Sequence, residues 1–235
     1  MTVESFQDIM NHLLPGIIES GYADPSACRE VCPSDAAVLC EIIESADPVH
    51  DVELRTLGCL TGIAAQLMAA RGEALIIRRR MDYVAYQMDA PRGMICVECD
   101  AGEHLGAYMS AGTVLCQGSC GDFAFRGACG GTGLIVGCAG DYCGEDLCGD
   151  AVVRVMGNVG RSAGRRMCGG SLRVEGDAGE FFCRYMEAGR ASARDVALLG
   201  ETYGGRIRAR GILAFEKGDE GTHRAELVVE SDGQA

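Results

Sequence analysis

The middle of the chain repeats about every 19 residues, and this repeat constrains the fold more than any other feature. Five windows of similar sequence begin at residues 99, 118, 137, 157 and 176. Four of them open on a glycine motif such as GSCG or GCAG, and most close on a glycine. Short periods of this kind are typical of solenoids, in which each unit packs only on its neighbours. The repeat therefore predicts a stack of similar coils.

Short runs rich in β-branched and aliphatic residues separate the windows: ICVE, VLCQ, LIV, VVRVM and SLRVE. Such runs are typical of β-strands. The predicted fold class is mainly β with a helical N-terminal region. Residues 74–211 are predicted to form a right-handed single-stranded β-helix, or β-solenoid, of stacked ~19-residue GXGXG coils, with coils ~4.8 Å apart.

Stacked coils place equivalent glycines above one another, so these glycines are interpreted as structural. A glycine recurs at a corner where φ is positive, or where a side chain would strike the next coil. A phosphate-binding loop is disfavoured, since no Lys-Ser/Thr pair and no long helix follow the motif. One column comprises Gly102, Gly121, Gly140, Gly160 and Gly179, and the coil-closing glycines are Gly112, Gly131, Gly170 and Gly189.

Residues 1–73 read as a helical region that caps the solenoid. Apolar residues at helical spacing from Phe6 to Ile18 predict a first helix that stops at Gly21, and Pro15 predicts a kink or two short helices. Ser34 is the predicted cap of a second helix that ends near Ser45, and a third runs from Val52 to about Ala70. Helices here would cover the exposed end of the solenoid core.

The solenoid is predicted to begin with a degenerate coil, residues 74–93, and to end with the strand of residues 204–211. Residues 190–203 break the repeat. The tail, residues 212–235, alternates like a strand and is expected to close the far end, with frayed last residues.

Charge and composition exclude several partners. The net charge of −13 disfavours nucleic acid and anionic membranes as partners. No apolar run reaches the ~18 residues of a membrane span, and the first residues lack the basic segment of a secretory signal. We therefore expect a cytoplasmic protein whose 14 cysteines are reduced, without disulfides.

The cysteines offer two candidate sites, and neither predicts a metal site strongly. An iron–sulfur cluster needs about four converging thiolates, and the candidates are Cys28, Cys32, Cys40 and Cys59. Cys129, Cys148 and Cys168 share one column, which is either a metal or redox site or a ladder of small side chains. We favour the ladder, because tetrahedral zinc needs converging ligands and not a straight row. The scattered His12, His50, His104 and His223 indicate no metal site, and no catalytic pair is recognisable.

Five stretches resemble the GXGXG β-helix domain found in the C-terminal region of the large (alpha) chain of glutamate synthase, which also occurs in one of the chains of formylmethanofuran dehydrogenase. The resemblance spans about residues 51–211 and departs from the pattern at Phe125, in a glycine column, and at Asp150, in place of a glycine. The stretches are RTLGCLTGIAAQL (residues 55–67), DAGEHLGAY (100–108), GDYCGEDLCGD (140–150), GRSAGRRMCGG (160–170) and CRYMEAG (183–189).

The resemblance implies a structural subunit with no catalytic residue and no cofactor of its own. FMN and iron–sulfur groups are then expected on partner subunits of a glutamate synthase-like oxidoreductase, and the chain would bridge glutaminase-type and FMN synthase-type chains. Assembly as a homo-oligomer stays open. The alternatives are a scaffold like the β-helix chain of formylmethanofuran dehydrogenase, and an iron–sulfur electron-transfer protein that uses the N-terminal cysteines.

Overall fold

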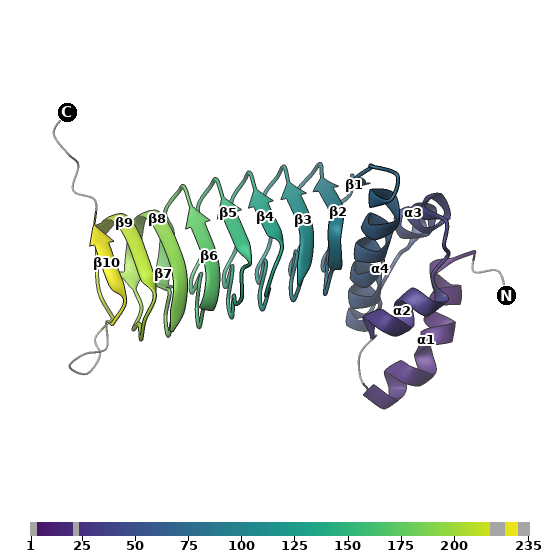
Figure 1. Cartoon of the computed structure of the whole chain (residues 1–235), viewed down its shortest axis with the longest axis horizontal. Helices are drawn as coiled ribbons and strands as arrows, with labels where there is room; N and C mark the ends of the chain where they lie inside the picture. Colours follow the sequence, from purple (N-terminus) through teal and green to yellow (C-terminus); the bar gives the residue numbers. More distant parts are fainter. Residues whose placement is uncertain (1–3, 21–23, 217–223, 230–235) are drawn as a thin grey trace.

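The protein is a rod with helices at one end, as the computed structural model of residues 4–20, 24–216 and 224–229 shows (Figure 1). N-terminal helices are followed by a parallel β-solenoid of about 8 turns with ~19 residues per turn. This confirms the fold class predicted from the repeat. The N-terminal helices and strand β10 (Glu226–Val229) lie at opposite ends of the rod.

The described residues of the N-terminal region form four helices: α1 (Phe6–Ser20), α2 (Pro25–Val31), α3 (Ala36–Ser45) and α4 (Asp51–Ala69). Pro15 does not divide this region into two short helices, because α1 is a single helix in which Pro15 is exposed. Its position lets water bind the carbonyl that the missing N–H leaves free. The predicted stop at Gly21 lies outside the described residues.

The second and third helices also differ from the prediction in detail. Asp35, and not Ser34, caps α3, since its carboxylate accepts a hydrogen bond from the Ala37 N–H at 2.9 Å. The sequence reading missed α2, a helix of 7 residues that Asp24 caps and Pro25 starts. A helix so short carries too few apolar positions to show a period.

The strands pair in parallel and in register along the rod. Residues one coil apart align, as in the buried column Val114, Gly133, Val153 and Leu172. Alternate side chains therefore enter the core or face outward. The strands are β1 (Leu75–Ile77), β2 (Asp89–Val97), β3 (Ala111–Cys116), β4 (Thr132–Ile135), β5 (Val152–Val155), β6 (Cys168–Val174), β7 (Ala178–Phe182), β8 (Ala188–Leu199), β9 (Arg206–Ile212) and β10 (Glu226–Val229).

Residues 190–203, which break the repeat in the sequence, continue the solenoid in the structure. This segment begins within strand β8, whose Arg190 pairs with Arg206 of β9, so this coil is 16 residues long. The repeat disappears from the sequence because the coil is shortened, whereas its strand still pairs on both sides. In the tail, β10 adds a further parallel strand to β9. The frayed residues predicted after it lie outside the described part.

The two glycine columns lie at the corners of the coils, and each requires glycine for a different reason. In the first column the backbone N–H of Gly121 donates to the Gly102 carbonyl at 2.9 Å, and that of Gly160 to the Gly140 carbonyl at 3.1 Å. A Cβ at Gly140 would lie 2.2 Å from an oxygen of Asp122, so lack of space requires glycine there. The second column has positive φ, for example 80° at Gly131.

A left-handed backbone turn recurs in successive coils beside these corners, and it holds a stack of aromatic rings. Tyr83, His104, Phe123 and Tyr142 occupy the same position of successive coils, all with positive φ. Their ring centroids are 4.5, 5.0 and 5.1 Å apart, and the rings lie within 8° of parallel. The stacking of these rings ties consecutive coils together.

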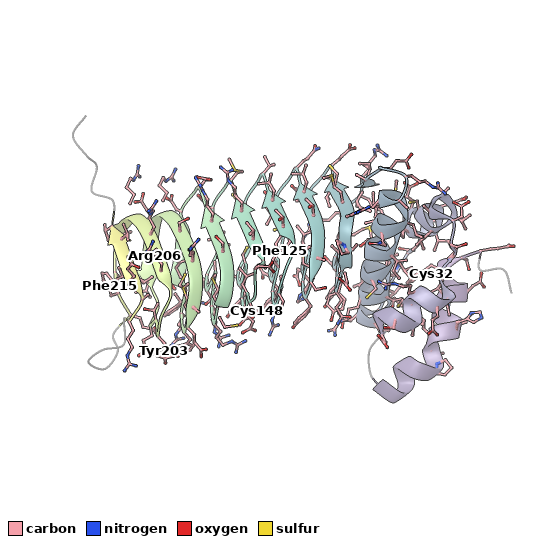
Figure 2. The ribbon with its side chains drawn as sticks, viewed as in Figure 1. Cys32, Phe125, Cys148, Tyr203, Arg206 and Phe215 are labelled. Atoms are coloured by element: carbon pink, nitrogen blue, oxygen red, sulfur yellow. A yellow bond between two sulfur atoms is a disulfide. The ribbon has the colours of Figure 1, made fainter. Side chains whose placement is uncertain are left out.

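Phe125 departs from the glycines around it because its coil has a compensating gap. The residues equivalent to Phe125 in the neighbouring coils are Gly106 and Gly144. The residues equivalent to Gly133 in the neighbouring strands are larger, Val114 and Val153. The Phe125 ring is 1% exposed and fills the space above Gly133 (Figure 2). One coil has therefore exchanged a large and a small side chain.

Helix α4 takes the place of a preceding coil at the start of the solenoid. In later coils the N–H groups of Gly106 and Phe125 donate to carbonyls of the coil before, at 2.8 and 2.7 Å. The N–H of Ala85 in the first coil donates instead to the Thr61 hydroxyl of α4, at 2.9 Å. Gly58 lets the helix approach, since a Cβ there would lie 2.2 Å from the Tyr83 carbonyl oxygen.

Replacement of Thr61 by valine is expected to destabilise the junction by about 1–3 kcal/mol, because the buried Ala85 N–H loses its acceptor. Thr56 is the matched control. It lies in the same helix and is equally buried, but its hydroxyl donates to the Val52 carbonyl of its own helix. Urea unfolding followed by circular dichroism should show a larger loss for T61V than for T56V, and equal losses would contradict this role of Thr61.

Candidate functional site

Three of the four candidate cluster cysteines come together, and the fourth lies apart. Cys28 and Cys32 of the α2 region face Cys59 of α4, whereas the Cys40 thiol contacts the sulfur of Met68 at 3.7 Å. A hydrogen bond with Cys28 raises the pKa of Cys59, and burial raises the pKa of Cys32 to about 12. Across the described residues, no group of three or more Cys, His, Asp or Glu side chains is placed to hold a metal ion.

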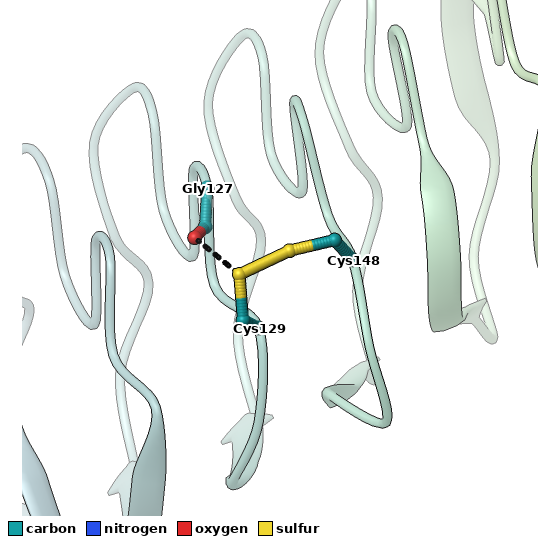
Figure 3. The surroundings of a disulfide bond; sticks show 3 residues. All are labelled: Gly127, Cys129 and Cys148. Atoms are coloured by element: carbon teal, nitrogen blue, oxygen red, sulfur yellow. Dashed lines mark hydrogen bonds between the residues drawn. A yellow bond between two sulfur atoms is a disulfide. The ribbon is translucent and has the colours of Figure 1, made fainter.

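The second cysteine column contains a disulfide, so the expectation that all the thiols are reduced is wrong. Cys129 and Cys148 are bonded (Figure 3). The register of the coils explains the bond, because it places their Cα atoms 4.5 Å apart, within the range that a disulfide bridges. Cys168, the third member of the column, is free and exposed. The column therefore links two coils covalently.

Alkylation should separate the thiols by burial. Cys138 and Cys168 are exposed, whereas Cys143 and Cys183 are buried. Burial raises the pKa of Cys143 to about 12, and it also raises the pKa of Cys183. A raised thiol pKa means less thiolate at pH about 8, and thus slower reaction. We expect iodoacetamide to modify the exposed pair in the folded protein and the buried pair only in denaturant, as read by peptide mass spectrometry. The bonded pair of the column should react only after reduction.

The most distinctive surface of the rod is the arginine-rich outer face of strands β5–β9. Arg154, Arg173, Ser192 and Arg208 align in one column of the sheet, and Arg190 and Arg206 in the next. Arg194 and Arg210 continue the same outward alternation. These seven arginines gather on one face of a chain whose net charge is −13.

Ser192 creates a hollow in this face because its side chain is short between long neighbours. Two adjoining depressions of about 350 and 410 Å³ share Ser192, Arg173 and Arg208. Their rims add Arg194 and Arg210 on one side and Arg190 and Arg206 on the other. We call this feature, the six arginines around Ser192, the arginine hollow.

Ion pairs hold several guanidinium groups of the arginine hollow in place. Arg173 pairs with Glu175 at 2.7 Å, Arg206 with Glu226 at 2.7 Å, and Arg210 with Asp195 at 2.8 Å. A hydrogen bond from Arg173 lowers the pKa of Glu175, so this carboxylate stays ionised at neutral pH. The exposed pairs add little stability, but they fix the directions of the arginine side chains.

The arginine hollow can bind anions but carries no evident chemistry. Its lining consists of arginine, serine, valine, leucine and alanine with a single carboxylate, Glu175. Among the described residues that line it there is no cysteine, histidine or lysine, so these offer no base that titrates near neutral pH and no activated nucleophile. Guanidinium groups bind carboxylates and phosphates in a bidentate manner.

An apolar region adjoins the arginine hollow on the same outer face, toward the helical end. Met94 and Val152 lie in the column that leads to Arg190. Val136 and Met156 follow the same alternation, and all four are more than 40% exposed. The sequence analysis predicted neither the apolar region nor the arginine hollow. The alternating arginines in RASAR and RIRAR were a visible signal for the arginine hollow.

The fold and this surface define the class of protein as a capped parallel β-solenoid with an exposed arginine-rich face. No protein-family model matches the chain, and the comparison with curated proteins gave no match either. In the described part of the chain, no helix is both long and apolar enough to span a bilayer.

Proposed function

We propose that the chain is a non-catalytic structural subunit of a multi-subunit oxidoreductase, and that it docks its partners through the outer strand face. The observation that carries the proposal is the combination of an exposed apolar region with the arginine hollow on one rigid sheet. Such a combination is suited to binding another protein and offers no catalytic group.

The physical properties of the face agree with a protein interface. Exposed Met94, Val136, Val152 and Met156 can bury apolar area against a partner. Arginine is enriched in interfaces because its planar head forms several hydrogen bonds and its stem packs on apolar groups. The partner surface is therefore expected to present carboxylates beside an apolar patch.

The resemblance of the sequence specifies the complex within this proposal. A glutamate synthase-like assembly would place glutaminase-type and FMN synthase-type chains on the rod, with FMN and iron–sulfur groups on those chains. A complex like formylmethanofuran dehydrogenase is the alternative. The iron–sulfur carrier is less supported, since Cys40 lies away from the other three N-terminal thiols.

A native pull-down from cells that produce the tagged full chain tests the proposal. We expect co-purification of a partner with the visible absorption of a flavin. The double variant R173E/R208E should reduce capture at least tenfold, whereas R29E, which changes an exposed arginine of α2, should not. Raising the salt concentration should weaken capture as well.

Two outcomes would contradict the proposal. One is a chain that purifies alone and catalyses a reaction by itself. The other is a partner that R173E/R208E and R29E retain equally, which would mean that docking uses another face of the rod. A partner without flavin would leave the structural role intact but contradict the glutamate synthase-like assembly.

A further inference from the structure

A small pocket lies where helix α4 meets the first coils, far along the rod from the arginine hollow. Its volume is about 180 Å³. Arg55 of α4 forms one side, and side chains of three successive coils form the rest. These are Tyr83, Tyr86 and Gln87 of the first coil, His104 and Tyr108 of the second, and Arg126 of the third.

Several polar atoms of this pocket are buried without a hydrogen-bond partner among the described residues. They include the Oε1 of Gln87, the Nδ1 of His104 and the Nε of Arg55. Buried polar atoms in folded proteins nearly always have a partner, and each exception requires an explanation. Their grouping in one pocket leaves these atoms available to a molecule that enters it.

The pocket has a positive character. The guanidinium of Arg55 pairs with Asp51 at 2.8 Å, and that of Arg126 with Glu145 at 3.0 Å. Glu145 is shared with two further arginines, Arg165 at 2.7 Å and Arg166 at 3.2 Å, so it offsets only part of their combined charge. An anion between Arg55 and Arg126 would thus meet one guanidinium that shares its carboxylate with two others and a second whose single partner, Asp51, is 59% exposed.

His104 responds to this positive environment. Burial lowers its pKa, and the charges of Arg126 and Arg55 lower it further, against smaller opposite effects of Asp51 and Asp82. The imidazole is therefore neutral at pH about 7. Its ring is held by stacking between Tyr83 and Phe123, at 4.5 and 5.0 Å. A neutral, fixed imidazole offers one donor and one acceptor at constant positions.

We propose that this pocket binds a small organic carboxylate that also carries an N–H or O–H group. The carboxylate would lie between Arg55 and Arg126, and the second group would donate to the Oε1 of Gln87. The volume equals that of about six liquid water molecules, roughly the size of a four-carbon hydroxy or amino acid. The tyrosines supply apolar walls with polar tips.

Isothermal titration calorimetry of the full chain at fixed ionic strength tests the proposal with four probes. L-malate and L-aspartate carry both groups, succinate lacks the donor, and inorganic phosphate lacks the carbon skeleton. We expect malate or aspartate to bind at least tenfold more tightly than succinate and phosphate. R55Q should weaken that binding at least tenfold, and Q87A should remove the preference over succinate.

R29E is the control, and thermal unfolding establishes that each variant is folded. NMR gives a measurement that needs no variant, because the His104 ring resonances should shift when the ligand binds. Equal binding of all four anions, or no binding of any at about 10 mM, would overturn the proposal. The proposal would also be overturned if malate or aspartate bound preferentially, if R55Q and Q87A left that preference unchanged, and if the His104 resonances did not shift.

Discussion

Replacing Gly133 with valine is expected to destabilise the protein by about 3 kcal/mol, because the new side chain has no room. A Cβ at this position would lie 2.1 Å from the Cζ of Phe125. Changing Phe125 to glycine is also expected to be costly, by about 3 kcal/mol, since it empties a ring-sized space in the core. Relief of its φ of 55° offsets part of that loss.

The two changes together should cost much less than their sum. The double variant F125G/G133V recreates the arrangement of the neighbouring coils, where glycine opposes valine. We expect it to lie within about 2 kcal/mol of the natural protein, which implies a coupling of several kcal/mol between the sites. Guanidinium unfolding monitored by circular dichroism measures this cycle.

The control for this cycle is F125G/T132V. Thr132 adjoins Gly133 but points outward and is exposed, so a valine there cannot fill the space that Phe125 leaves. This pair should be no more stable than F125G. If F125G/G133V is as unstable as the sum of the single variants, the two positions do not compensate each other.

Replacing Glu145 with glutamine should cost about 2–3 kcal/mol, because Arg126, Arg165 and Arg166 would lose the negative charge that they share. The Glu145 carboxylate is 2% exposed and contacts all three arginines. Removal of one member of a buried ionic group costs about 3–5 kcal/mol, and partial solvent exposure of these arginines reduces the figure. Chemical unfolding measures the loss.

Asp146 provides the matched control for Glu145. It is the next residue and also pairs with Arg166, at 2.7 Å, but its side chain is 36% exposed. D146N is therefore expected to cost less than about 1 kcal/mol. Equal effects of E145Q and D146N would mean that burial of the carboxylate does not decide its contribution.

The repeat made the coil architecture predictable because a solenoid needs the same corner in every turn. Gly102, Gly121 and Gly140 recur at nearly constant spacing, and the structure stacks them. The repeat did not predict the shortened coil that begins at Arg190. Its strand still pairs in parallel with both neighbours, because that pairing depends on the strand and not on the length of the loop. Periodicity thus predicts a solenoid well and its irregular turns poorly.

The surfaces were harder to predict than the fold. They are formed by residues that are distant in the sequence and become neighbours only when the coils stack in register. The arginine hollow needs a small Ser192 between Arg173 and Arg208, and these residues are separated by 19 and 16 positions in the sequence. The disulfide is a similar case. The sequence showed that Cys129 and Cys148 share a column and therefore lie close together. We nevertheless expected reduced thiols, because the chain was expected to be cytoplasmic, and the disulfide was not predicted.

Because the coils stack, the distance between the two ends of the molecule can change without any change in what each end binds. Each coil contacts only its neighbours, so insertion or removal of one unit between β3 and β5 would change the length of the rod by about 4.8 Å and leave both ends intact. The number of turns thus works as a ruler that sets the distance between whatever the α4 junction binds and whatever the arginine hollow holds.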